Sequence, residues 1–106
     1  MSHRPLQLAS EIRRVVSEVF NEHIEFPPGL LVTVVGTDIS SDLKKATIRL
    51  SILPEHKQGT GLEAAKKRSG FIQRNVARNL PMKSIPRIEL ALADQTWLDA
   101  QNLPNP

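Results

Sequence analysis

Apolar residues recur every three or four positions along the first part of the chain. These positions are Leu8, Ile12, Val15, Val16, Val19 and Phe20. Charged and polar residues stand between them, so one helical face can pack on a core while the other meets water. Pro5 suits the first turn, where its missing N–H has no helical partner. The pattern predicts an amphipathic helix from about Pro5 to about His23, and Pro27-Pro28-Gly29 prevents it from continuing.

The next region has the patterns of two β-strands. Residues from Leu30 to Thr37 are mostly β-branched or apolar, which favours a strand. The Asp and Ser side chains from Asp38 to Asp42 can bond nearby backbone and so favour a turn. Apolar and polar residues then alternate from Ala46 to Ile52, as in a strand with one buried face. The short link predicts an antiparallel pair. The side chains expected in water are Thr47, Arg49 and Ser51.

Two shorter helices are predicted in the second half of the chain. Thr60 and Glu63 have the spacing of a capping box, which predicts a helix N-cap at Thr60. Ser69-Gly70 interrupts this helix and predicts a kink. A third helix follows and ends before Pro81, because the residue before a proline is pushed out of the helical conformation. The apolar side of this third helix consists of Ile72, Val76 and Leu80.

A last strand completes the pattern. Ile88, Leu90 and Leu92 alternate with Glu89 and two alanines, and a turn-rich tail is expected after Asp94. Helices must cover one face of the three-stranded sheet to bury its apolar side chains. The sequence therefore predicts a two-layer α+β domain over residues 1–94, in the order α-β-β-α-kink-α-β, followed by a short tail at 95–106.

Composition narrows the class of protein. A chain of 106 residues, with 40% apolar and 24% charged positions, is typical of one globular domain. The absence of cysteine excludes a disulfide framework, a thiolate zinc site and a cysteine nucleophile. The sequence contains no run of 18 apolar residues, so it predicts no membrane-spanning helix. The start from Met1 to Pro5 lacks the apolar stretch of a secretory signal, so we expect a cytoplasmic protein.

Basic residues are concentrated in one part of the chain. Between Ala64 and Ile88 there are seven Lys and Arg residues and no Asp or Glu: Lys66, Lys67, Arg68, Arg74, Arg78, Lys83 and Arg87. Such clustering attracts a polyanion. Three Phe, one Trp and no Tyr are too few for a row of base-stacking platforms. The alternative is that these residues are ordinary solubilising surface charges.

Catalytic patterns are absent from the sequence. His3, His23 and His56 do not have metal-ligand spacing. Asp38 and Asp42 suit turn stabilisation, and no phosphate-binding loop or dinucleotide fingerprint occurs. Trp97 is expected to pack on the domain rather than to stack on RNA. We therefore expect no enzyme activity, no metal, no cofactor and no small-molecule substrate.

Three separated stretches resemble bacterial ribosome-binding factor A, a KH-like domain of type II topology. They are Val34 to Ile48, Ser69 to Gln73 and Ile85 to Leu90. Arg4-Pro5 also fits the head of the first helix, so the resemblance runs from about Arg4 to Asp94. Arg68 departs from the family, which usually has Ala there; its cation would either alter the angle between the helices or point to solvent.

The resemblance implies an assembly factor that binds the free small ribosomal subunit, contacts 16S rRNA and assists its late maturation, also in cold adaptation. A monomer without membrane contact is expected. The kink at Ser69 and Gly70 would present helix N–H groups to anions. The lone Gly70 does not form the Gly-x-x-Gly clamp of RNA-gripping KH domains, so recognition by shape and phosphate is expected. The predicted RNA-binding residues are Arg4, Lys66, Lys67, Arg68, Arg74, Arg78, Lys83 and Arg87.

Two other functions remain open at this point. One is a general single-stranded RNA-binding KH-like module, which predicts tight binding to short unstructured oligonucleotides. The other is a protein adaptor that uses an exposed sheet edge. Adaptor binding would depend little on salt, whereas phosphate contacts predict a steep dependence.

Overall fold

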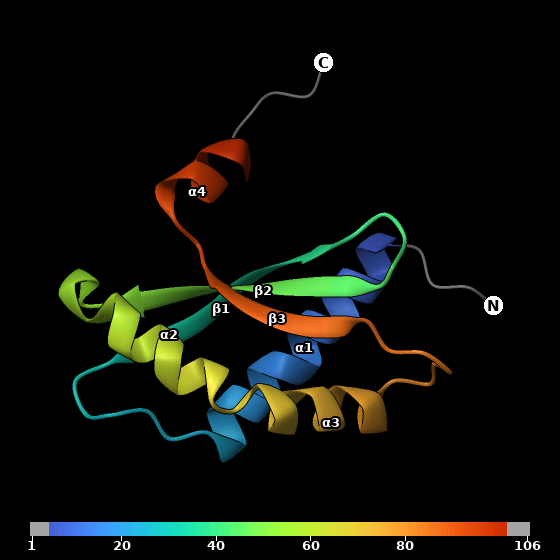
Figure 1. Ribbon diagram of the computed structural model, residues 1–106, viewed down its shortest axis with the longest axis horizontal. Coiled ribbons are helices and arrows are strands. Elements are labelled where there is room, and N and C mark those ends of the chain that lie inside the picture. Colours follow the sequence, from blue (N-terminus) through green and yellow to red (C-terminus); the bar gives the residue numbers. More distant parts are fainter. Residues whose placement is uncertain (1–4, 102–106) are drawn as a thin grey trace.

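A computed structural model describes residues 5–101 of the chain. Its elements are α1 (Pro5–His23), β1 (Leu31–Ile39), β2 (Lys45–Leu53), the 3-10 turn η1 (Glu55–Lys57), α2 (Gln58–Lys66), α3 (Ser69–Asn79), β3 (Arg87–Leu92) and α4 (Gln95–Gln101). Helices α1, α2 and α3 lie against one face of the sheet, whereas α4 projects away from them (Figure 1). The predicted two-layer α+β fold, with a three-stranded sheet, is confirmed.

The sheet has the strand order β1-β2-β3. Strand β1 pairs antiparallel with β2, as predicted, and β3 pairs parallel with β2. The parallel pair requires a crossover, which α2 and α3 provide. Alternate side chains of β2 from Ala46 to Ile52 are buried beneath the helices. On its other face Thr47, Arg49 and Ser51 are partly buried rather than fully in water, a correction to the prediction.

The junction between α2 and α3 differs from its prediction in two ways. Helix α2 begins at Gln58, without a side-chain cap, because η1 runs directly into it; the proposed cap at Thr60 is therefore wrong. The break lies at Lys67 and Arg68, one step before the predicted kink. Arg68 N–H donates to the Ala65 carbonyl and closes α2. Ser69 and Gly70 are the first two residues of α3 rather than the break itself.

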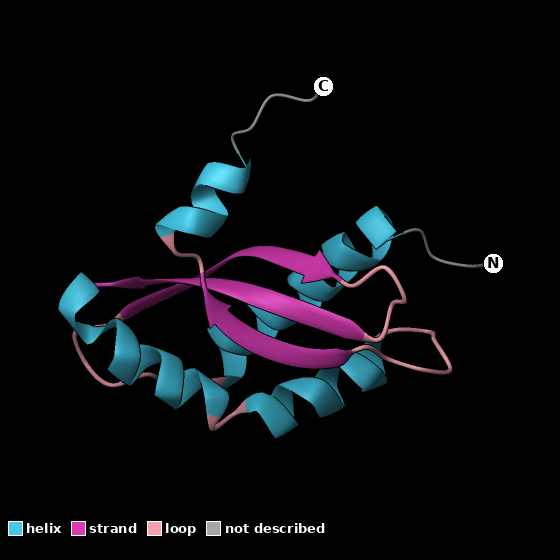
Figure 2. Cartoon of the chain, turned by 45° about the horizontal axis from the view of Figure 1, so that its top comes forward, coloured by secondary structure: helices cyan, strands magenta, loops and turns pink. Residues whose placement is uncertain are grey.

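A short helix replaces the turn-rich tail that the sequence predicted. Asp94 starts α4, because its Oδ1 accepts a hydrogen bond from the Trp97 N–H over 2.9 Å. Trp97 packs against Gly36 of β1, which confirms the expectation that this ring packs on the domain. Figure 2 shows α4 standing apart from the three core helices. The domain boundary at residue 94 stays a prediction.

Candidate nucleic-acid interface

Helix α3 has one apolar side and one basic side. Ile72 and Val76 are fully buried, whereas Arg74 and Arg78 are exposed. Side chains four residues apart lie on one helical face, so the two guanidinium groups form a short positive row. A Cβ placed on Gly70 would lie 3.4 Å from Nη1 of Arg74. Arg74 therefore extends back over the first turn of α3, beside the junction with α2.

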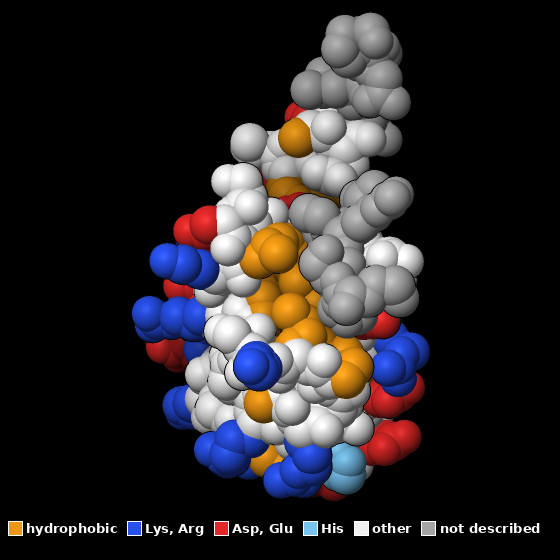
Figure 3. Space-filling model, turned by 90° about the vertical axis from the view of Figure 1, so that its right-hand side faces the viewer, with side chains coloured by type: hydrophobic (Ala, Val, Ile, Leu, Met, Phe, Trp, Pro, Cys, Tyr) orange, Lys and Arg blue, Asp and Glu red, His pale blue; other side chains and the backbone are white. Residues whose placement is uncertain are grey.

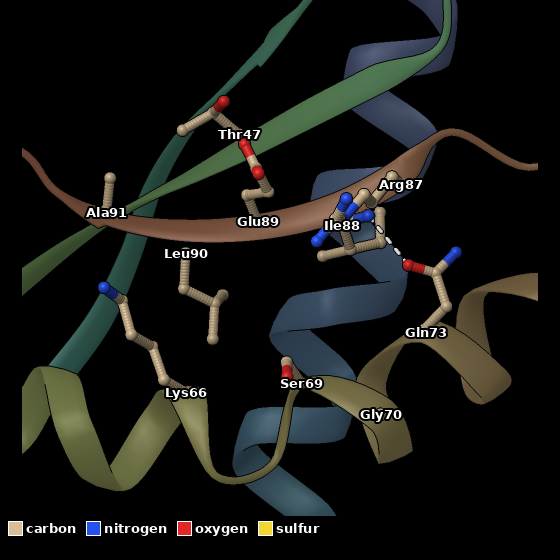
Figure 4. A pocket seen from close by; sticks show the side chains of 10 residues that line it. All are labelled: Thr47, Lys66, Ser69, Gly70, Gln73, Arg87, Ile88, Glu89, Leu90 and Ala91. Carbon is tan, nitrogen blue, oxygen red and sulfur yellow. Dashed lines mark hydrogen bonds between the residues drawn. The ribbon is translucent and has the colours of Figure 1, made fainter.

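A groove of about 600 Å³ lies between this junction and strand β3 (Figure 4). Its lining residues are Thr47, Lys66, Ser69, Gly70, Gln73 and the strand residues Arg87 to Ala91. Lys66 extends from the end of α2 toward the strand, and Arg87 projects from the start of β3. The two cations therefore stand toward opposite ends of one groove, although they are far apart in the chain.

One acidic side chain also lines the groove. Glu89 forms an ion pair with Lys45 of the neighbouring strand, with 3.5 Å between its Oε2 and Nζ of the lysine. Both side chains are about half exposed, so the pair contributes little to stability. Lys45 does offset the negative charge of Glu89. Because Lys66 and Arg87 also line the groove, an anion there would meet a net positive lining.

The side chain of Gln73 joins α3 to the start of β3. Its Nε2–H donates to the Pro86 carbonyl over 3.0 Å, and its Oε1 accepts from the Ile88 N–H over 2.7 Å. Both bonded residues flank Arg87. The groove wall formed by α3 is thus connected to its strand wall by side-chain hydrogen bonds as well as by apolar packing.

The remaining predicted binding residues lie outside this groove. Lys67 and Arg68 are exposed at the helix junction and line a separate hollow that also contains two glutamates. Lys83 is exposed in the loop before β3, and Arg4 lies outside the described residues. Seen from the end that carries this loop, Lys and Arg side chains gather along two edges of the molecule (Figure 3). The predicted cations are therefore distributed over the groove, the second hollow and the loop before β3.

Some groove residues were not singled out by the sequence. The strand patterns placed Thr47 and Glu89 at the polar positions of their strands, but nothing in those patterns indicated that they line a groove. Gln73 falls within one of the family-like stretches, but nothing in that stretch indicated a bond to β3. Arg68, where the family usually has Ala, is exposed, so its cation points to solvent.

Acidic residues near the hairpin have structural partners. Asp42 Oδ1 accepts hydrogen bonds from the Ser40 hydroxyl and the Lys44 N–H. These bonds, with the Ser40 bond the stronger influence, lower the pKa of Asp42 below its ordinary value.

Within residues 5–101, no group of three or more His, Asp or Glu side chains is arranged to hold a metal ion. No helix in that range is long and apolar enough to cross a membrane.

Comparison with known proteins shows which family this chain belongs to. The sequence profile of ribosome-binding factor A matches residues 4–103. The chain belongs to this family. A relative from Roseiflexus castenholzii, also named ribosome-binding factor A, is 33% identical over 95 residues, which cover 87% of this chain and 72% of the relative. The resemblance seen in the sequence is therefore confirmed.

Solved structures of the family have the same fold. The crystal structure of ribosome-binding factor A from Thermus thermophilus has a TM-score of 0.73 and 21% identity, over 91% of this chain and 99% of that one. A homology model of the Thermus thermophilus protein, fitted into a cryo-EM map of a 30S complex, has a TM-score of 0.65 and 23% identity. That alignment covers 78% of this chain and 88% of the other.

Proposed function

We propose that this protein binds the free small ribosomal subunit through 16S rRNA and assists late maturation of that RNA, including during cold adaptation. It acts in the cytoplasm as a monomer, and its role is assembly rather than catalysis. The observation that carries the proposal is the groove with Lys66 and Arg87 toward its ends and Arg74 beside it. The names of the relatives, and the 30S complex of the Thermus thermophilus protein, support the same partner.

Phosphate contacts explain how this surface would bind folded RNA. Each Lys or Arg that meets a phosphate releases counterions, which provides affinity and makes it steeply dependent on salt. Such contacts fix the position of a protein on RNA when they are held at set distances. Lys66, Arg74 and Arg87 stand on two helices and a strand, so the fold sets their spacing. Further contacts are proposed from Arg4, Lys67, Arg68, Arg78 and Lys83.

A general single-stranded RNA module is the weaker alternative. Proteins that bind unpaired RNA stack its bases on aromatic side chains, and KH domains clamp it with a Gly-x-x-Gly loop. None of the described groove residues is aromatic, and Gly70 is the only glycine among them. These features favour a folded RNA, recognised by shape and phosphate.

The adaptor alternative requires a free sheet edge, and the two edge strands are β1 and β3. Part of the β3 edge is already occupied, because Gln73 accepts a hydrogen bond from the Ile88 N–H. Arg49 also donates to the carbonyl of Leu92, at the other end of the strand. A protein strand added at β3 would have to displace these bonds, which resembles the way natural sheets protect their edges.

The test is co-sedimentation with purified 30S subunits across a salt series. The variant Arg74→Glu/Arg78→Glu reverses the positive row of α3. The control Arg13→Glu/Lys57→Glu makes the same change in net charge on α1 and η1, outside the groove. We expect the first variant to lose binding and the control to retain it, with native circular dichroism in both. Full binding by the α3 variant would refute the proposed interface.

Two further measurements separate the alternatives. Fluorescence polarisation with short unstructured RNA should show weak binding, and tight binding would favour the single-strand module. Cells that lack the protein should accumulate immature 16S rRNA in their free small subunits, most strongly in the cold. Normal 16S maturation in such cells at low temperature would refute the assembly role even if the protein binds subunits.

A further inference from the structure

The side-chain carboxamide of Gln73 in α3 forms hydrogen bonds through both its nitrogen and its oxygen, and both partners are backbone groups at the start of β3. The Nε2–H donates to the Pro86 carbonyl and the Oε1 accepts from the Ile88 N–H, over 3.0 and 2.7 Å. The bond to Ile88 is the dashed line in Figure 4. Other amide side chains on α3 behave differently. Asn75 donates to the Phe71 carbonyl and Asn79 to the Asn75 carbonyl, so each bonds only its own helix.

The bond to Ile88 satisfies a backbone group that the sheet leaves open. Along β3, the N–H groups of Arg87 and Ala93 donate to carbonyls at Lys44 and Leu50, on the β2 side. Alternate residues of a strand direct their N–H groups to opposite sides. The N–H groups of Ile88 and Leu90 therefore point to the outer edge of β3. Gln73 supplies the partner for Ile88, and no side chain among the described residues does so for Leu90.

The residue enclosed by these two bonds is Arg87. Its neighbours Pro86 and Ile88 are both held by Gln73, and its own N–H donates to the Lys44 carbonyl. The backbone is thus bonded on both sides of the strand at the point where the arginine side chain leaves it. A long cationic side chain loses conformational entropy when it binds, and a fixed backbone reduces the additional ordering that binding requires.

We propose that Gln73 is a positioning residue for RNA binding, which holds Arg87 and the first turn of α3 at a fixed distance across the groove. It contacts the protein backbone and not the RNA. This inference rests on the proposed function, because Arg87 must be an RNA contact for its position to matter. It also extends that function, since it makes the spacing of cations from different elements, rather than their number, a determinant of affinity.

The structural part is tested by amide hydrogen exchange measured by NMR. Gln73→Met keeps a similar side-chain length but removes both hydrogen bonds. In the wild type, the Ile88 amide should exchange more slowly than the Leu90 amide. In Gln73→Met the Ile88 amide should lose this difference, while the amides of Arg87 and Ala93 stay protected. The matched control is Asn75→Leu, which removes an amide bond within α3 and should leave Ile88 unchanged.

The functional part is tested by pairing Gln73→Met with alanine substitutions and measuring affinity for 30S subunits. Arg87→Ala should lower the salt slope of wild-type binding by about one. In the Gln73→Met background, the effect of Arg87→Ala on affinity should fall to less than half. Arg78→Ala, at the far end of α3, should have the same effect in both backgrounds, because Gln73 does not hold that end.

The possible outcomes are distinguishable. If wild-type protein fails to bind 30S subunits, the proposed function is wrong and the positioning role falls with it. If the wild type binds but Arg87→Ala is equally harmful with and without Gln73, the positioning role alone is refuted. Unchanged exchange at Ile88 in Gln73→Met would also overturn it. A purely structural role predicts equal losses for Arg87→Ala in both backgrounds, together with a general loss of amide protection.

Discussion

Substituting Gly36 by alanine should release α4 from the sheet. A Cβ at Gly36 would lie 2.6 Å from Cη2 and 2.7 Å from Cζ2 of Trp97, closer than carbon atoms can approach. Gly36 does not have a positive φ, so alanine can adopt its backbone conformation. The ring must therefore move, and the strand need not. No residue of α4 is buried, so the helix has little other contact to keep it in place.

Three contacts of Trp97 set the size of the effect. Its Nε1–H donates to Asp38 Oδ2 over 2.7 Å, the Arg49 guanidinium lies 5.9 Å from its ring centroid, and its ring covers Gly36. The cation–π contact contributes about 0.5 kcal/mol at such an exposed site, and the hydrogen bond about 1 kcal/mol. With partial burial of the ring, we expect docking of α4 to weaken by about 2 kcal/mol, which is about 30-fold in its equilibrium constant.

Tryptophan fluorescence measures this docking directly, because the chain has one Trp and no Tyr. In Gly36→Ala the emission should shift to the red and become more accessible to iodide, while the circular dichroism of the core elements stays native. The control is Gly59→Ala, where no atom lies within 4 Å of the added Cβ; its emission should match the wild type. Wild-type emission and quenching in Gly36→Ala would refute the packing argument.

Two other expectations concern α2 and the hairpin. Gly61→Ala should destabilise the protein in urea unfolding, because its Cβ would lie 2.7 Å from Ile52 Cγ2. Gly59→Ala in the same helix should instead stabilise the protein by about 1 kcal/mol. Equal effects of the two substitutions on the free energy of unfolding would contradict this account. The lowered pKa of Asp42 means that its stabilising bonds are complete above the pKa of the unfolded chain and are lost as pH falls through the lower folded value. An NMR titration should therefore give Asp42 a lower midpoint than the same residue in an unfolded peptide, and Ser40→Ala should raise that midpoint.

Local patterns predicted α1 and the hairpin because burial imposes a regular period on neighbouring residues. The apolar stripe from Leu8 to Phe20 and the alternation from Ala46 to Ile52 arise because one face of each element is buried, whichever element covers that face. The predicted start of α2 was wrong because it also depended on a local signal. A capping box at Thr60 is a local signal, but η1 supplies a continuous turn before it, and the helix begins earlier.

The candidate groove and α4 depended on contacts between distant parts of the chain. Three features could be read from the amino-acid sequence alone: the family resemblance, the elements with strong periodicity and the basic composition of the segment from Ala64 to Ile88. Only the parallel crossover brings Lys66 and Arg87 to one groove, and only the approach of α3 to β3 gives Gln73 its strand partners. Likewise, α4 has no apolar stripe and is held by Trp97 over Gly36. A period along the chain reports which face is buried, whereas such pairings depend on how the elements pack in three dimensions.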